Sequence, residues 1–254
     1  MPYLEVAASR LYYELHGEGD AVVLAHGVGG NHASWFNQVP TLAQRHRVVL
    51  IDQRGFGNST DAEGLGRSGF VRDLELLLDH LAIESAVLVG QSMGGGTCSG
   101  FTCAHPDRVR ALVMADTLVG LALPEEIAPF MAQNEAAMLN LTQAERVLGP
   151  RTRRDEPERT LLYLQIASFN EVALRTLKGR FEPNGPEALA ATGVPMLFIV
   201  GEDDILFPPR AVRCVQQHVP GARFVQIPGA GHSAYFEQPQ AFNRELLAFL
   251  DTLQ

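Results

Sequence analysis

The stretch that most constrains how this chain folds runs from Ala86 to Gly96 and reads Ala-Val-Leu-Val-Gly-Gln-Ser-Met-Gly-Gly-Gly. The short β-branched apolar run predicts a buried strand, and the apolar residues after it recur at helical spacing. Ser92 therefore lies where a strand turns into a helix, between Gly90 and Gly94. Such a turn is sharp, and glycine is needed where a side chain would collide with neighbouring backbone. We interpret Ser92 as a candidate nucleophile, the alternative being a solvated serine in a tight loop.

The rest of the chain alternates strand-like and helix-like segments. Two short alternating segments, near residues 3–7 and 10–15, predict an antiparallel hairpin. Apolar runs that predict strands covered on both faces follow at residues 21–25, 48–51, 86–89, 111–115, 196–200 and 223–227. This order predicts an α/β fold with a mostly parallel, twisted sheet of about eight strands flanked by helices.

One part of the chain interrupts the alternation. From residue 119 to about residue 186 no strand-like run occurs. The helices expected there lie near Glu125–Leu141, Gln143–Leu148, Glu158–Phe169 and Glu171–Phe181, with a solvated connection at residues 151–159. The chain of 254 residues is long enough for one large domain. We therefore predict one core domain, residues 1–118 and 187–254, with a helical lid at residues 119–186 inserted after the sixth strand.

A serine hydroxyl is a poor nucleophile at neutral pH and needs a base, usually an imidazole oriented by a buried carboxylate. Asp204 follows the predicted strand at 196–200, and His232 follows the strand at 223–227. Both lie at the carboxyl ends of parallel strands, where open α/β sheets build their sites. We choose Asp204 as the acid and His232 as the base, with Asp203 and Asp116 as rival acids.

The same reasoning predicts where an oxyanion would be held. Attack on a carbonyl creates negative charge, and backbone amides aimed at that charge stabilise it. The amide of Met93 directly follows Ser92, and the amide of Val28 lies in the glycine-rich loop after the strand at 21–25. That loop lacks the G-x-G-x-x-G spacing and the P-loop lysine, so nucleotide binding is disfavoured.

Composition narrows the possible partners. The formal net charge of −9 shows no excess of basic residues of the kind that binds nucleic acid. Cys98, Cys103 and Cys214 show no metal-ligand spacing and suggest a reducing compartment. Neither a signal peptide nor a membrane span is expected, so we predict a cytoplasmic protein, monomeric or homodimeric, with no metal and no cofactor.

Taken together, these residues resemble the α/β-hydrolase superfamily over essentially the whole chain. The matching pieces are His26-Gly27, Asp52-x-Arg54-Gly55-x-Gly57-x-Ser59, Gly90-Gln91-Ser92-Met93-Gly94-Gly95, His105-Pro106-x-Arg108-Val109, Gly201-x-x-Asp204 with Pro208, and Gly231-His232 with Glu237-x-Pro239. The order serine, acid, histidine is the one that accompanies this turn in the superfamily. The turn is similar to those of small bacterial esterases, 3-oxoadipate enol-lactonases and cofactor-free haloperoxidases.

The resemblance implies a serine hydrolase that cleaves a small carboxylic ester or lactone through an acyl-enzyme. Ser92 stands where dehalogenases and epoxide hydrolases carry an aspartate, which disfavours those activities. Alternatives are peroxide-dependent or carbon–carbon chemistry by the same triad, although Gln91 and Ser233 depart from the pattern of carbon–carbon hydrolases. A receptor with a slow triad is a third hypothesis. The side chains expected to line the pocket are Trp35, Phe56, Phe130, Met131 and Phe169.

Overall fold

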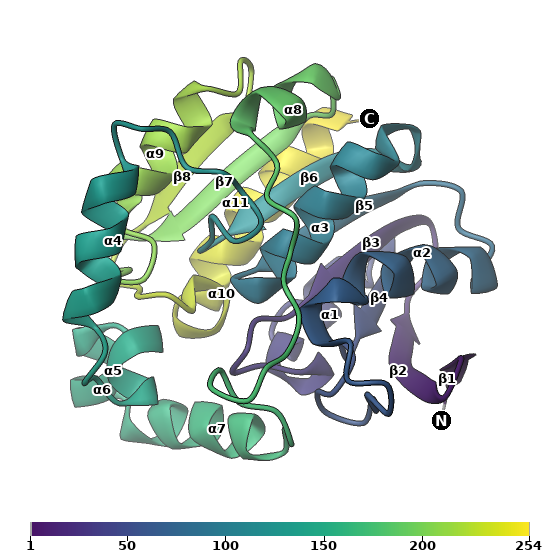
Figure 1. The fold of residues 1–254 in the computed structure, drawn as a ribbon, viewed down its shortest axis with the longest axis horizontal. Coiled ribbons are helices and arrows are strands. Elements are labelled where there is room, and N and C mark those ends of the chain that lie inside the picture. The colour runs from purple at the N-terminus through teal and green to yellow at the C-terminus, as the bar shows by residue number, and fades with distance from the viewer. Residues whose placement is uncertain (1, 254) are drawn as a thin grey trace.

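The computed structural model describes residues 2–253, which fold around one eight-stranded sheet (Figure 1). The strands follow the order β1-β2-β4-β3-β5-β6-β7-β8, with antiparallel pairs β1–β2 and β2–β4 and parallel pairs elsewhere. Their bounds are β1 Tyr3–Val6, β2 Ser9–His16, β3 Asp20–Ala25, β4 His46–Ile51, β5 Ala86–Gln91, β6 Val109–Ala115, β7 Met196–Gly201 and β8 Arg223–Ile227. The predicted hairpin and mostly parallel sheet are confirmed.

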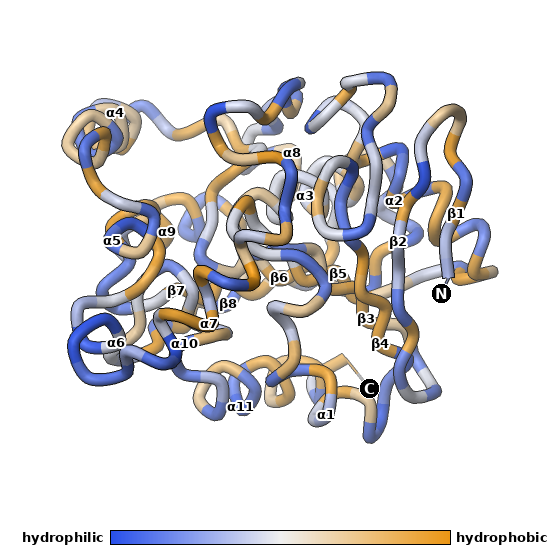
Figure 2. Tube along the Cα trace, turned by 90° about the horizontal axis from the view of Figure 1, so that it is seen from below, coloured by the Kyte–Doolittle hydropathy of each residue, from blue (hydrophilic) through white to orange (hydrophobic). Residues whose placement is uncertain are grey.

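Helices cover both faces of this sheet. Seen from the edge in Figure 2, α2, α3 and α8 lie on one side of the strands and α1 and α11 on the other. The bounds are α1 Val39–Leu42, α2 Phe70–His80, α3 Met93–Ala104, α8 Pro186–Ala191, α9 Pro209–Gln217, α10 Ala234–Glu237 and α11 Pro239–Leu250. Short 3₁₀ helices lie at His32–Trp35, Gly66–Ser68, Pro106–Arg108 and Asp251–Leu253. Within residues 2–253, no helix is long and apolar enough to span a bilayer.

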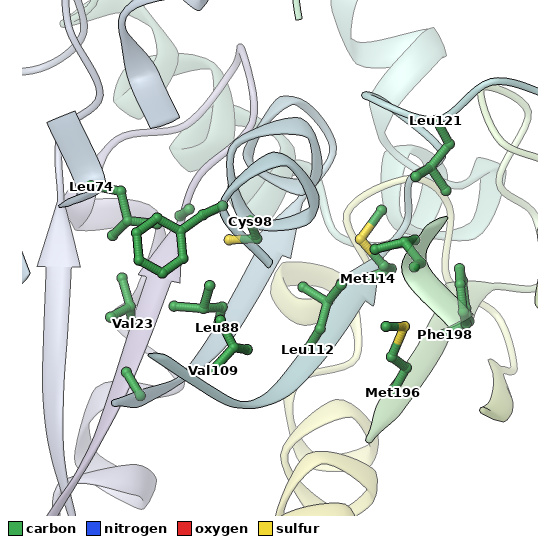
Figure 3. Close-up of a cluster of buried hydrophobic side chains, with 14 of the residues drawn as sticks. Val23, Leu74, Leu88, Cys98, Val109, Leu112, Met114, Leu121, Met196 and Phe198 are labelled. Atoms are coloured by element: carbon green, nitrogen blue, oxygen red, sulfur yellow. The ribbon is translucent and has the colours of Figure 1, made fainter. Parts of the chain in front are cut away.

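The central strands β5 and β7 are buried at every position because helices cover both faces of the sheet and each face buries alternate side chains. In β5, Leu88 packs into the cluster beneath α2 and α3, whereas Val87 and Val89 pack into the cluster beneath α11. Figure 3 shows the first cluster, in which Leu88 lies between strand residues such as Val23 and the helix residue Cys98. Two separate cores therefore hold the central strands in place.

The chain between β6 and β7 leaves the sheet and forms a group of helices, at the left and lower edge of Figure 1. They are α4 Ala128–Ala137, α5 Gln143–Val147, α6 Pro150–Asp155 and α7 Pro157–Ser168. We call α4–α7 the helical insertion. The segment predicted as a solvated connection instead contains α6, whose N-terminal Pro150 has the fixed φ that begins a helix. The domain boundary at residues 119–186 stays a prediction.

The helix expected over Glu171–Phe181 is absent from the described structure. Two carbonyls of this segment instead accept hydrogen bonds from Arg67. The Lys178 carbonyl accepts from the Arg67 amide, and the Gly179 carbonyl accepts from the Arg67 Nε–H. Leu177 packs separately into a small cluster that includes Phe56. Tertiary hydrogen bonds and packing thus replace the intrahelical bonds that the apolar spacing predicted.

The loop after β4 is braced by Asp52 and Arg54, which pair with different partners. Asp52 is fully buried and accepts from the backbone and ring of His32, with an Nδ1–Oδ2 distance of 2.8 Å. Arg54 binds Asp73 through two guanidinium nitrogens, at 2.9 and 2.6 Å. Burial opposes charge on His32, but the Asp52 hydrogen bond and charge raise its pKa. Each residue therefore pairs with a different element.

The two-sided core predicts a large stability cost for truncating a central strand. Leu88 is fully buried, so Leu88→Ala removes its methyl groups and leaves a cavity. We expect the free energy of unfolding, measured by urea denaturation, to fall by about 2–5 kcal/mol. The matched control is Leu139→Ala, where the side chain is 67% exposed and a change within about 0.5 kcal/mol is expected. A small loss at Leu88 would contradict the packing described here.

Candidate active site

Ser92 occupies the turn between β5 and α3 in a strained backbone conformation. Its φ of 50° and ψ of −118° lie outside the regions that side-chain-bearing residues favour. A Cβ on Gly90 would overlap the backbone of Gly94, and a Cβ on Gly94 would overlap the Ala25 carbonyl. The glycines thus permit a close approach of α3 to β3 and β5. Ser92 therefore lies at the carboxyl end of the central strand β5.

The structure brings Ser92, His232 and Asp204 into one hydrogen-bonded chain. His232 Nε2 lies 2.9 Å from Ser92 Oγ, and His232 Nδ1 lies 3.0 Å from Asp204 Oδ2. An ionised carboxylate can only accept, so the Nδ1 proton belongs to His232 and donates to Asp204. The other nitrogen, Nε2, is then free to accept the Ser92 hydroxyl proton. This is the protonation state that a general base requires.

Backbone and side-chain contacts fix the orientation of both partners. Asp204 Oδ1 accepts from the amides of Leu206 and Phe207, at 2.8 and 3.0 Å. Gln91 Nε2 donates to the His232 carbonyl at 2.9 Å. Asp204 and His232 each make a further hydrogen bond outside the contact between them. These additional hydrogen bonds favour a single orientation of both residues.

Asp116, the rival acid, has a different environment. It is fully buried, and its two oxygens accept from the amides of Gly201 and Ala234, at 2.8 and 3.0 Å. Burial and the neighbouring charge of Asp204 raise the pKa of Asp116 well above its usual range. Because it binds the end of β7 and the start of α10, Asp116 connects the two segments that carry Asp204 and His232. No hydrogen bond joins Asp116 to the imidazole within the described residues.

A second buried carboxylate, Glu237, was not singled out as functional by the sequence. Its Oε1 accepts the Gly231 amide at 2.8 Å, and its Oε2 accepts the Gly149 amide at 2.7 Å. Burial raises the pKa of Glu237. Gly231 precedes His232, and Gly149 lies in the helical insertion, so one side chain links the insertion to the histidine loop.

Val28 and Met93 both line the cavity into which Ser92 opens. Among residues 2–253, neither of their amides donates to another protein group, because Met93 begins α3 and Val28 lies in a loop. A Cβ on Gly27 would lie 2.8 Å from Ser92 Cβ, so the loop passes directly beside the serine. Buried His26 holds this loop by accepting the Gln53 amide at Nε2, at 3.0 Å.

Ser92 and His232 open into a cavity of about 780 Å³ between the sheet and the helical insertion. Its apolar lining includes Val119, Leu123, Met131, Met138, Leu141 and Leu177. Of the five side chains expected to line the pocket, only Met131 does so. The sequence missed the polar lining residues, which include Arg67, Glu135, Gln143, Arg146, Tyr163 and Arg175. Nothing in their spacing distinguishes them from ordinary surface residues.

The other four expected pocket residues lie elsewhere, and those predictions are wrong. Trp35 is fully buried against Tyr235, with ring centroids 4.5 Å apart. Phe56 is fully buried, with its ring centroid 5.2 Å from that of His26. Phe130 packs under the Arg210 guanidinium, and Phe169 is 70% exposed at the end of α7. Apolarity and motif position did not fix which way these rings point.

One group of potential metal ligands lies outside the cavity, although no metal spacing was recognised in the sequence. Cys214 and His218 are one helical turn apart at the end of α9, and the loop before α4 brings Glu126 against them. His218 Nε2 lies 2.8 Å from Glu126 Oε1. This contact is an ion pair when His218 is protonated, and none of the three residues lines the cavity that holds Ser92.

The chain matches the sequence pattern of the α/β hydrolase fold over residues 20–239. It belongs to the α/β hydrolase family. This α/β hydrolase is 30% identical to the pimeloyl-acyl-carrier-protein methyl ester esterase of Aeromonas hydrophila over 250 residues, which cover 90% of this chain and 94% of that protein.

Two solved structures are similar over nearly the whole of this α/β hydrolase. A thermophilic esterase from Thermogutta terrifontis aligns with a TM-score of 0.79 and 27% identity, covering 96% of this chain and 94% of that one. An enzyme that degrades N-acyl homoserine lactones aligns with a TM-score of 0.82 and 27% identity, covering 98% and 100%. Relatives and structural neighbours thus include esterases and a lactone-degrading enzyme.

The separate environments of Asp204 and Asp116 predict opposite outcomes for the same substitution. Labelling of Ser92 by a fluorophosphonate, followed by intact mass, measures nucleophile activation without a substrate. Asp204→Asn should slow labelling at neutral pH by about 10³-fold or more, because the asparagine no longer fixes the imidazole tautomer. Asp116→Asn should change the labelling rate by less than about tenfold, because Asp116 makes no hydrogen bond to His232 within the described residues. The reverse ranking would make Asp116 the orienting acid.

Proposed function

We propose that this α/β hydrolase is a serine hydrolase that cleaves a small carboxylic ester or lactone through an acyl-enzyme. The observation that supports this most directly is the 2.9 Å contact between His232 Nε2 and Ser92 Oγ, with His232 in turn bound to Asp204. A base within hydrogen-bond distance of a serine hydroxyl is the arrangement that nucleophilic acyl transfer needs. The relatives that act on esters and lactones favour the same substrate class.

In the first half-reaction, His232 takes the Ser92 hydroxyl proton as Oγ attacks the substrate carbonyl. The carbonyl π electrons move to oxygen, and the amides of Val28 and Met93 donate to the resulting oxyanion. One such donor lowers the activation free energy by on the order of 3 kcal/mol. Asp204 stabilises the imidazolium that forms without taking its proton.

Collapse of the tetrahedral intermediate breaks the bond to the leaving oxygen, which takes the proton from His232. In a lactone the leaving alcohol stays attached to the acyl group. Water then enters, gives a proton to His232 and attacks the acyl carbon, and Ser92 leaves with that proton. The cycle converts the ester and one water into acid and alcohol, and each of its proton transfers passes through His232.

The helical insertion acts in this proposal as a lid, the role expected of residues 119–186. Its residues Met131 and Met138 on one side, and Met93 on the other, enclose the space in front of Ser92. A cavity of about 780 Å³ is within the range of sites that hold small organic ligands. The apolar lining favours an acyl or alcohol group of several carbons.

Loss of the nucleophile tests the proposal. Steady-state hydrolysis of p-nitrophenyl acetate, butyrate and octanoate should be saturable in the wild type, and Ser92→Ala should lower kcat/KM by at least about 10⁴-fold. Mass spectrometry of the wild type quenched during turnover should detect Ser92 carrying the acyl group. The circular dichroism spectrum of the variant should match that of the wild type.

Two experimental outcomes would contradict the proposed ester or lactone hydrolysis and favour a different function. A folded wild type that hydrolyses none of these esters but forms peracetic acid from acetate and hydrogen peroxide would indicate perhydrolysis by the same acyl-enzyme. A wild type that is acylated but does not release product would favour a receptor with a slow triad.

A further inference from the structure

One end of the cavity carries polar groups that the proposed chemistry does not use. A Cβ on Gly29, next to the proposed oxyanion amide of Val28, would lie 2.5 Å from Tyr163 Oη and 3.0 Å from Gln143 Nε2. These groups come from α7 and α5 of the helical insertion and reach across to the oxyanion loop. Burial raises the pKa of Tyr163 to about 12, so its hydroxyl keeps its proton and can donate. The Ser233 hydroxyl lies close enough to Tyr163 to lower its pKa by hydrogen bonding, whereas Gln143 Nε2 donates to no other protein group within residues 2–253.

Arg146 lies three residues after Gln143 on α5 and lines the same cavity. Residues three apart share a face of a helix, so the guanidinium and the amide point the same way. The half-buried Arg146 has no carboxylate within 4.0 Å and donates to no acceptor in the described part of the chain. An arginine that is partly removed from water without a partner is a site for an incoming acceptor.

The charge of the lining also differs in sign from that of the whole protein. The chain carries 20 basic and 29 acidic residues, excluding histidine. The charged residues that line the cavity are Arg67, Arg146 and Arg175 against the single acid Glu135, leaving His232 aside. Low-dielectric walls focus such a field, so the cavity attracts anions although the molecule as a whole repels them.

We propose that Gln143, Arg146 and Tyr163 form a carboxylate-binding subsite, and that the substrate is an ester or lactone carrying a carboxylate apart from the bond that is cleaved. This inference rests on the proposed function. A planar guanidinium binds the two oxygens of a carboxylate through parallel N–H donors, and the amide and phenol supply neutral donors beside it. One cation with two neutral donors matches a singly charged group better than a phosphate dianion.

Paired substrates of equal length test the subsite. p-Nitrophenyl hemiglutarate and p-nitrophenyl valerate differ in their acyl ends, and the butyrate ester of 4-hydroxybenzoate and phenyl butyrate differ in the alcohol. The wild type should prefer the carboxylated member of at least one pair in kcat/KM by about tenfold or more, which is the effect of one hydrogen bond to a charged group. Added salt should reduce this preference.

Substitution of the arginine should remove the preference for the carboxylated ester. We expect Arg146→Gln to lower the ratio of kcat/KM for the preferred carboxylated ester to that for its neutral partner about tenfold. Arg146→Lys should keep part of the preference because the positive charge remains. The matched control is Arg154→Gln, since Arg154 is 71% exposed and pairs with its neighbour Asp155. It should behave as the wild type.

Binding without turnover separates this inference from the proposed function. Isothermal titration of the wild type with glutarate should give saturable binding that Arg146→Gln weakens about tenfold and Arg154→Gln leaves unchanged. Binding that depends on Arg146 in an enzyme inert to esters would overturn the proposed function and keep the subsite. Hydrolysis of neutral and carboxylated esters at equal rates, with glutarate binding indifferent to Arg146, would overturn the subsite alone. Tighter Arg146-dependent binding of inorganic phosphate than of glutarate would also overturn the carboxylate assignment.

Discussion

The backbone turn at Ser92 is the constraint on which the rest of this structure depends. A side-chain-bearing residue at φ 50° is strained, and the strain persists because the surrounding strands and α3 allow no other path for the chain. The approach of α3 to β3 leaves no room for a Cβ at Gly94. That approach places the serine at the mouth of the cavity, with the first amide of α3 beside it.

Buried carboxylates transmit this order to loops that are far apart in sequence. Asp204 holds the imidazole, Asp116 joins the end of β7 to α10, and Glu237 joins the histidine loop to the helical insertion. The oxygens of each carboxylate accept hydrogen bonds from backbone amides or from His232. These hydrogen bonds offset the free-energy cost of burying a charged group. Backbone contacts reinforce these links, since the Asp203 amide donates to the Ala230 carbonyl and Gly149 packs directly against Gly231.

The region between β6 and β7 is where sequence patterns predicted the secondary structure least well. The strands were predictable because continuous apolar runs fit a sheet covered on both faces, and all of them were found. Residues 171–181 carry helical spacing but form no helix, and the carbonyls of Lys178 and Gly179 instead accept from Arg67 in the 3₁₀ helix Gly66–Ser68. The prediction of aromatic pocket residues was wrong for a related reason. Trp35 and Phe56 are apolar enough to line a pocket or to pack in a core, and the structure buries both in the core.

The sequence by itself determined the α/β architecture and the three positions Ser92, Asp204 and His232, because local periodicity and strand-end motifs fix where such residues lie along the chain. Only the tertiary structure decided which residues face the cavity. Arg146 and Arg154 are indistinguishable in sequence, yet one lines the cavity and the other pairs with Asp155 in solvent. The rotation of each helix in the insertion is set by long-range packing, and that packing selects the side chains available to a ligand.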